Sequence, residues 1–214
     1  MVVDNFDLIL DQLSFDNRDE FYFVQIIQRR KDGNEGLHVR NGYRLIKSYY
    51  IYSKQELIDL KDRIIELCRN NNARAYINLN VRNAKEVALE CIKKYADLVL
   101  NDNSFMGNNI WDSSCGSTRA RGHKALWVVD VDNLEHLETI KQAINLCMGA
   151  PGERIKCIVP TVHGCHLITY GFNREELNDR LRGTEVGYVD VHKNNPTILY
   201  YDIPSQQEQG SIQS

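Results

Sequence analysis

The stretch ALWVVDVDN, residues 125–133, is an apolar run that contains two aspartates, Asp130 and Asp132. Its β-branched residues and its short length predict a buried strand. Side chains alternate between the two faces of a strand, so both carboxylates share one face while Val129 and Val131 take the other. A carboxylate in apolar surroundings is costly unless a charge compensates it. We therefore expect a divalent cation to hold these two acids in place.

The residues that follow predict a regular alternation of strands and helices, from their hydrophobic spacing and their turn and capping residues. The expected elements are a strand over 125–132, a helix over 134–148, strands over 155–160 and 164–170, a helix over 173–182 and a strand over 186–192. This β-α-β-β-α-β order is that of the ferredoxin-like split unit, which RNA-recognition (RRM) domains also use. In that topology the first strand lies between the fourth and the third.

The fourth and third strands of this unit each bring one polar side chain toward the two aspartates. In YVDV, residues 188–191, Asp190 faces away from the valines on either side of it. In TVHGCH, residues 161–166, His166 lies on the third strand. Since both strands neighbour the first, we expect three carboxylates and one imidazole to converge on the open face of one sheet.

Three carboxylates this close together repel, and without a cation at least one of them is driven to protonate. Mg²⁺ or Mn²⁺, bound by a few carboxylates and by substrate phosphates, removes the conflict. Two such ions about 3.5–4 Å apart clamp the attacking and leaving oxygens of an in-line displacement at phosphorus. We then expect His166 to donate to a triphosphate, and Gly164, which has no side chain, to let phosphate approach the backbone.

Three segments resemble the ordered motifs of the archaeo-eukaryotic primase superfamily, most closely its phage and plasmid primase-polymerase type. They are VVDVD (128–132), TVHGCH (161–166) and YVDV (188–191). They correspond to a hydrophobic-flanked D-x-D, a small-residue-x-x-G-x-H segment and a hydrophobic-D. The motifs cover only residues 126–191, and the first half of the chain is similar in architecture alone. Each motif is weak by itself, and the specificity lies in their order on strands that the topology brings together.

The resemblance implies template-directed addition of nucleoside triphosphates, as in DNA replication. It implies Asp130, Asp132 and Asp190 as ligands of Mg²⁺ or Mn²⁺ and His166 as the triphosphate contact, with Thr161 or Gly164 beside it. Single-stranded template and replication partners such as a helicase are the implied macromolecular partners. The sequence departs from the family pattern at its cysteines and at Thr161, among other respects. Its cysteines form no zinc-binding set, and Thr161 stands where Ser is more usual.

The first half of the chain predicts a separate α/β module. Its expected elements are strands over 21–30, 43–52 and 73–80 and helices that begin at the capping residues Ser53 and Asn83. The expected organisation is an N-terminal α/β module over 1–100, a linker or mobile loop over 101–124, an RRM-like catalytic module over 125–205 and a disordered tail over 206–214. The expected fold class is thus α/β (α+β), with the N-terminal module packed on the catalytic module and the active site in the cleft between them.

Several basic residues are candidates for binding nucleotide or template. Arg119, Arg121 and Lys124 precede the aspartate-bearing strand, and Lys193 follows Asp190. Clustered Arg and Lys bind nucleic acid productively because they release counterions. The alternative is an ordinary solvated loop. The formal net charge of −3 means that nucleic acid must be met by such a local patch rather than by a global field.

Simpler interpretations stand beside these. Asp132 precedes a helix and is also suited to cap it, and His166 is also suited to a satisfied place in the core. A zinc site from His163 and Cys165 beside His166 is disfavoured, because adjacent strand residues such as Cys165 and His166 point to opposite faces. The KDG in residues 31–33 resembles the adenylated-lysine motif of ligases, but at a hairpin tip a solvated turn is the better expectation.

The composition limits the classes of protein to which the chain can belong. The 214 residues are 43% apolar and 26% charged, which is ordinary for a globular protein. We expect a reduced, cytoplasmic protein, with no signal peptide and no membrane partner. The alternatives to a primase-polymerase are a metal-dependent phosphodiesterase or nuclease, and a catalytically silent module that binds nucleotide or nucleic acid. Acids on the open sheet face, where an RNA-recognition domain places stacking aromatics, disfavour plain RNA binding.

Overall fold

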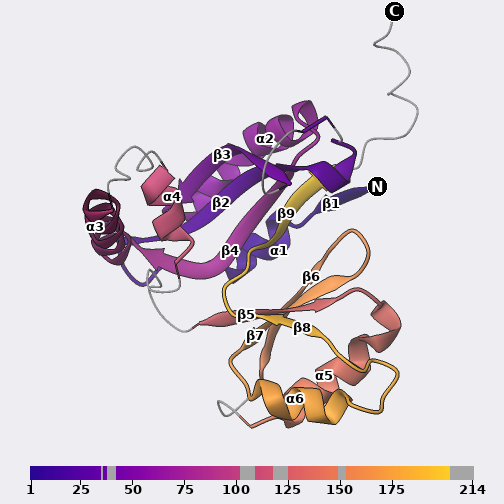
Figure 1. Ribbon diagram of the computed structural model, residues 1–214. Helices are drawn as coiled ribbons and strands as arrows, with labels where there is room; N and C mark the ends of the chain where they lie inside the picture. The colour runs from indigo at the N-terminus through magenta and orange to yellow at the C-terminus, as the bar shows by residue number, and fades with distance from the viewer. Residues whose placement is uncertain (35, 38–41, 102–108, 118–124, 149–152, 203–214) are drawn as a thin grey trace, which may run out of the picture.

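The protein is a mixed α/β structure with two antiparallel sheets (Figure 1). The computed structural model describes residues 1–34, 36–37, 42–101, 109–117, 125–148 and 153–202. The first sheet has the strand order β1-β9-β4-β2-β3, and the second has the order β6-β7-β5-β8. None of the described helices is both long enough and apolar enough to cross a bilayer.

The strands of the first sheet come from both ends of the chain. They are β1 (Val2–Asp4), β2 (Glu20–Arg29), β3 (Tyr43–Ile51), β4 (Arg74–Asn83) and β9 (Thr197–Asp202). The accompanying helical segments are α1 (Phe6–Gln12), the 3₁₀ turn η1 (Arg30–Asp32), α2 (Lys54–Asn70), α3 (Ala84–Leu100) and α4 (Ile110–Cys115). The predicted strands over 21–30, 43–52 and 73–80 are therefore present. Short β1 and α1, which the sequence pattern did not predict, precede them.

The two predicted capping residues begin their helices as expected. The Ser53 hydroxyl accepts a hydrogen bond from the backbone N–H of Glu56 at 3.1 Å, which starts α2. The Asn83 side chain accepts from two backbone N–H groups in the first turn of α3. Helix α2 buries Leu57 and Ile64 against the first sheet, so its amphipathic face supplies much of the core there.

The second sheet consists of β5 (Leu126–Val131), β6 (Ile155–Pro160), β7 (Cys165–Tyr170) and β8 (Asp190–His192). Its helical segments are η4 (Leu134–His136), α5 (Leu137–Leu146) and α6 (Arg174–Leu181). Strand β5 lies between β7 and β8, which is the strand order expected from the sequence. Helices α5 and α6 cover the face of this sheet that is turned away from the first sheet (Figure 1). Val129 and Val131 are buried there against Ile144 and Leu177.

The other face of the second sheet packs against the first sheet over part of its length. Leu126 and Val128 belong to the same buried cluster as Ile77 and Leu199. The Asn80 side chain joins the sheets further, since it accepts from the backbone N–H of Leu126 at 2.6 Å and donates to the Leu126 carbonyl at 2.8 Å. The face that the sequence predicted to be open is thus covered at the Leu126 end of β5, and the two pockets lined by Asp130 lie at the other end.

The chain returns to the first sheet in β9 (Figure 1), which pairs with β4 and with β1. Residues Thr197–Asp202 therefore belong to the first sheet, although the sequence assigned all of 125–205 to the catalytic module. The run is almost wholly buried, and such a run fits the middle of any sheet. Its residues alone do not specify which sheet receives it.

Part of the expected linker over 101–124 is a helix. Helix α4 packs on the first sheet, where its Asp112 accepts from the Ser48 hydroxyl at 2.5 Å and from the Tyr50 hydroxyl. Six residues are too few for a helical period to be visible in the sequence. Residues 102–108 and 118–124 lie outside the described part of the chain, and so does the predicted tail over 206–214.

Candidate functional site

Asp130 lies between two polar residues on neighbouring strands. It is in direct register with His166 on β7 and with Asp190 on β8. Directly opposed residues of antiparallel strands project to the same face, with Cβ atoms about 5 Å apart. The alternation along the chain places Asp132, just beyond the end of β5, on that face as well. The register thus brings together the three predicted carboxylates and the predicted imidazole.

The His166 ring is held from both sheets. Its Nδ1 lies 2.8 Å from the hydroxyl oxygen of Thr197, a buried residue of β9, and its Nε2 lies 3.5 Å from a carboxylate oxygen of Asp130. Burial lowers the pKa of His166, although the nearby Asp130 charge opposes this. The imidazole is therefore favoured in its neutral form. The sequence pattern missed Thr197, because the interaction depends on β9 crossing back to the first sheet.

The pKa of Asp130 is shifted upward, in the opposite direction to that of His166. Burial raises the pKa of Asp130, His166 lowers it, and the charges of Asp132 and Asp190 raise it again. A nearby cation would offset both the cost of burying the Asp130 charge and its repulsion by Asp132 and Asp190. Among the described residues, no three His, Cys, Asp or Glu side chains are grouped closely enough to hold a metal ion in their present conformations.

Asp132 is not the cap of the helix that follows it. The neighbouring Asn133 accepts from the backbone N–H of Glu135 at 2.9 Å and so begins the 3₁₀ turn. The carboxylate of Asp132 is exposed and lines pockets on both sides of β5. It is therefore available to a ligand, and the simpler interpretation of this residue as a helix cap does not apply.

Gly164 has a different role from the predicted one. A β-carbon on this residue would lie 1.9 Å from the carbonyl oxygen of Val131 and 3.0 Å from the α-carbon of Asp132. Its missing side chain thus lets the β6–β7 turn approach the end of β5, rather than leaving space for a phosphate. Thr161 closes the same turn, because its hydroxyl accepts from the backbone N–H of Gly164 at 3.1 Å. The pair positions the end of β5 that carries Asp132.

A pocket of about 210 Å³ opens between the two sheets at this point, and we call it the basic pocket. One wall is formed by the second sheet and its β6–β7 turn, with Asp130, Asp132, Thr161, Val162, His163 and His166. The opposite wall is formed by the first sheet and the turn after β2, with Arg29, Lys31, Arg74, Tyr76 and Ile198. Cations on one wall therefore face carboxylates on the other. The sequence pattern did not predict that these three cations would face the carboxylates.

The cations of the basic pocket differ in how they are paired. Arg74 donates to both carboxylate oxygens of Asp32 at 2.7 and 2.6 Å, and its guanidinium lies 4.3 Å from the centre of the Tyr201 ring. Arg29 donates to the Tyr76 hydroxyl at 2.7 Å. No described carboxylate forms an ion pair with Arg29 or Lys31, so their charges remain available to an anion. The KDG segment is a turn in which Lys31 and Gly33 are exposed, as expected, although the Asp32 side chain is buried under Arg74.

A second pocket, of about 280 Å³, lies on the other side of the two aspartates. We call it the β8-side pocket, because Asp190, Val189 and Tyr188 form its wall together with His136 and Ile140. Asp130 and Asp132 line both pockets, whereas His166 lines only the basic pocket and Asp190 only this one. The carboxylates of Asp130 and Asp132 thus separate the two pockets, and we call this pair the ridge.

Of the predicted basic contacts, only Lys193 is described, and it does not lie at this ridge. The Lys193 ammonium lies 5.0 Å from the centre of the Trp127 ring, and Trp127 packs on the core beneath α5 and α6. Lys193 is therefore on the opposite face of the sheet from Asp130. The other predicted basic residues, Arg119, Arg121 and Lys124, lie outside the described residues.

The zinc alternative is not favoured by the structure. Cys165 is buried in the core beneath the helices, on the face opposite His166. The exposed His163 lines the basic pocket instead. Cys165 and His166 thus lie on opposite faces of the sheet, as the strand alternation predicted.

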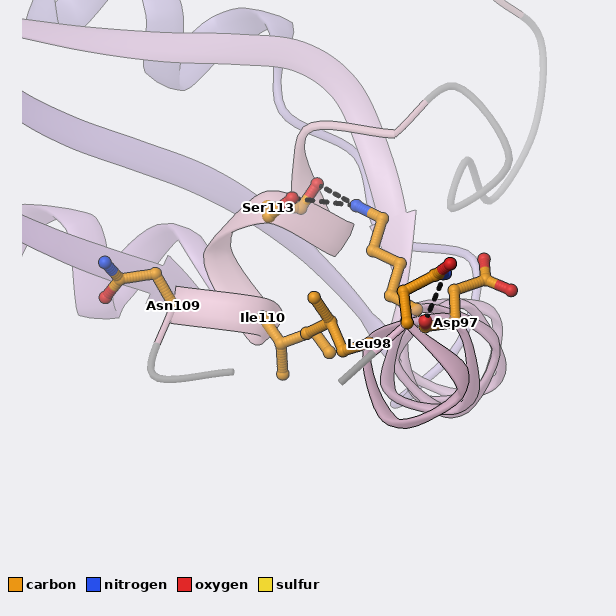
Figure 2. A pocket seen from close by; sticks show the side chains of 7 residues that line it. Asp97, Leu98, Asn109, Ile110 and Ser113 are labelled. Atoms are coloured by element: carbon orange, nitrogen blue, oxygen red, sulfur yellow. Dashed lines mark hydrogen bonds between the residues drawn. The ribbon is translucent and has the colours of Figure 1, made fainter. Parts of the chain in front are cut away.

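A larger pocket, of about 510 Å³, lies between α3 and α4 (Figure 2). Leu98 and Ile110 line it, and Asp97 and Asn109 stand at its edges. Its lysine, Lys94, donates to the backbone carbonyl of Ser113 at 2.7 Å and to the Ser113 hydroxyl at 2.9 Å. This cation holds α4 against α3, and Asp97 is the only acid among the described residues that line the pocket.

The acids and the histidine are therefore concentrated where β5 pairs with β7 and β8. The comparisons with known proteins add no identification to this geometry. No family model, no curated protein and no solved structure matches the chain.

Proposed function

We propose that the protein is a metal-dependent nucleotidyltransferase of primase-polymerase type that adds nucleoside triphosphates along a single-stranded template. The second sheet with α5 and α6 would be its RRM-like catalytic module, packed on the N-terminal module. One observation carries the proposal. Asp130 stands in register between Asp190 and His166, with Asp132 beside it on the same face.

The donor set fits a hard divalent cation. Asp130, Asp132 and Asp190 supply only carboxylate oxygens, which Mg²⁺ and Mn²⁺ prefer, and Mg²⁺ sites commonly combine one or two carboxylates with water and substrate phosphates. The pKa of Asp130 is raised first by burial and further by the charges of Asp132 and Asp190, and a bound cation would oppose both effects. When bound, the metal would polarise the attacking hydroxyl and the reacting phosphate. These three aspartates would hold it.

The basic pocket suits the triphosphate. A neutral His166 that accepts the Thr197 hydroxyl proton at Nδ1 carries its own proton on Nε2, on the side of Asp130 and the pocket. Arg29 and Lys31 would attract the phosphates and compensate the charge that develops on departing pyrophosphate. Because Thr197 and Tyr76 hold His166 and Arg29 before substrate arrives, catalysis would rest on positioning and electrostatics.

The proposal includes a cytoplasmic setting and replication partners such as a helicase. All six cysteines are free thiols, with no disulfide among them, which suits a reducing compartment.

The test is incubation of the protein with Mn²⁺, labelled nucleoside triphosphates and a primed single-stranded template. We expect an extended product, abolished in the double variant Asp130→Ala, Asp132→Ala and retained in Asp62→Ala, which removes an exposed aspartate of α2. A shortened template would instead indicate a nuclease that uses the same acids with water as the attacker. A gel shift with neither product would indicate a silent binding module.

A further inference from the structure

The two pockets beside β5 differ in a way that distinguishes the two substrates of a transfer reaction. The basic pocket lies on the β7 side of β5 and the β8-side pocket on the other, because β7 and β8 flank β5. Asp130 and Asp132 line both. A phosphorus atom held at these carboxylates would therefore have one cavity on each side.

The lining of the β8-side pocket is unsuited to a triphosphate. No described lysine or arginine lines it, and Asp190 adds a third carboxylate to those of the ridge. Asn133 and His136 are its other polar lining residues, and Ile140, Val186 and the ring of Tyr188 supply apolar and aromatic surface. Apolar and aromatic side chains with a few polar groups match a nucleoside, in which a flat base is joined to a sugar.

Tyr188 is held outward by the backbone just before β8. Gly187 has a φ of 64°, in the left-handed region, and the backbone N–H of Tyr188 donates to the carbonyl of Val186 at 2.7 Å. This tight turn replaces the start of the strand expected over 186–192, so β8 begins only at Asp190. The Tyr188 side chain is left 55% exposed, with its hydroxyl accepting from the Arg174 guanidinium at 3.2 Å.

In-line displacement places the attacking and leaving oxygens on opposite sides of the reacting phosphorus. If pyrophosphate departs into the basic pocket, the attacking hydroxyl must come from the β8 side. Resting on the proposed function, we infer that the β8-side pocket receives the 3′-terminal nucleotide of the growing strand, with the ring of Tyr188 stacked on its base. The 3′ oxygen forms a bond to the α-phosphorus and its proton passes to solvent. The bond from the α-phosphorus to the bridging oxygen breaks, and pyrophosphate takes the electron pair.

The experiment measures primer extension with Mn²⁺ and separates the KM for the primer from the KM for the nucleoside triphosphate. Tyr188→Ala is expected to raise the KM for the primer about tenfold, the effect of losing one stacked base, with little change in the KM for the nucleotide. Tyr188→Phe keeps the ring and should recover most of the primer affinity. Tyr95→Ala, which removes an exposed ring of α3, is the matched control.

The possible outcomes distinguish failure of the primer placement from failure of the polymerase proposal. Extension by the parent protein with a primer KM unaffected by Tyr188→Ala, or with the nucleotide KM raised instead, overturns the placement of the primer and leaves the polymerase proposal standing. Failure of Tyr188→Phe to recover primer affinity overturns the stacking role. Absence of any extension by the parent protein contradicts the polymerase proposal itself, and the placement of the primer falls with it.

Discussion

Gly164 lies so close to Val131 that a β-carbon on the glycine would be 1.9 Å from the valine carbonyl oxygen. The β6–β7 turn and the end of β5 can approach each other only because residue 164 has no side chain. The contact fixes the backbone from which Asp132 projects. A change at Gly164 should therefore affect both the stability of the fold and the geometry of the acids.

Gly164→Ala should lower the free energy of unfolding by about 1–3 kcal/mol, the usual cost of overpacking. It should also reduce nucleotide transfer, because the obstructing atom is rigid backbone and the end of β5 must move. Denaturant titration and extension rates check this. Gly36→Ala is the matched control, since a β-carbon there meets no atom within 4 Å. Equal stabilities of the two variants would contradict the role given to Gly164.

Two buried threonines provide a paired test of how His166 is held. Thr197→Val removes the hydroxyl that contacts His166 Nδ1, and it should cost about 1 kcal/mol of stability and weaken nucleotide binding. Thr169→Val removes a buried hydroxyl oxygen that has no hydrogen-bond partner among the described residues, so it should be neutral or stabilising. The measurements are the free energy of unfolding and the affinity for a labelled nucleotide. A loss of nucleotide affinity in Thr169→Val as large as that in Thr197→Val would argue against the contact.

Arg29→Gln should raise the KM for the nucleoside triphosphate about tenfold, the effect of one lost charge-assisted hydrogen bond to phosphate. The KM for the primer should change little, because Arg29 lines the basic pocket and not the β8-side pocket. Arg63→Gln, on the exposed surface of α2, is the control. A rise in the primer KM alone would place the triphosphate elsewhere.

Alkaline pH should destabilise the fold through two buried thiols. Burial raises the pKa of Cys68 to about 12 and that of Cys115 to about 12, from an ordinary value of 9.0. The unfolded chain therefore releases these protons at a lower pH than the folded chain does. The stability that these two protonated thiols contribute is fully present below about pH 9 and is lost as the pH rises toward 12. Denaturant titrations across this range should show the decline, with a shallower slope in Cys68→Ala than in the parent.

The sequence was sufficient to predict the second sheet and the meeting of its polar residues. Alternation along β5 and the strand order determine which residues oppose Asp130, and both are local or topological properties. The turn at Gly187 was missed, because Val186 and Tyr188 have strand-forming side chains and only the backbone conformation departs from a strand.

The sequence pattern could not predict which residues of the two sheets face each other. Arg29 and Arg74 lie on strands of the first sheet, and nothing in their spacing states which residues of the second sheet they will face. Thr197 is also unremarkable in sequence until β9 is known to cross back. Residues that meet through tertiary packing leave no periodic signal in the chain. That is why the carboxylates were predicted and the cations opposite them were not.

The most direct test of the central claim is a crystal structure with Mn²⁺ and a non-hydrolysable nucleoside triphosphate, recorded at a wavelength where manganese scatters anomalously. We predict an anomalous peak within coordinating distance of Asp130 and of at least one of Asp132 and Asp190, with the triphosphate extending toward His166 and Arg29. Manganese bound elsewhere, or a triphosphate that avoids the basic pocket, would contradict the account.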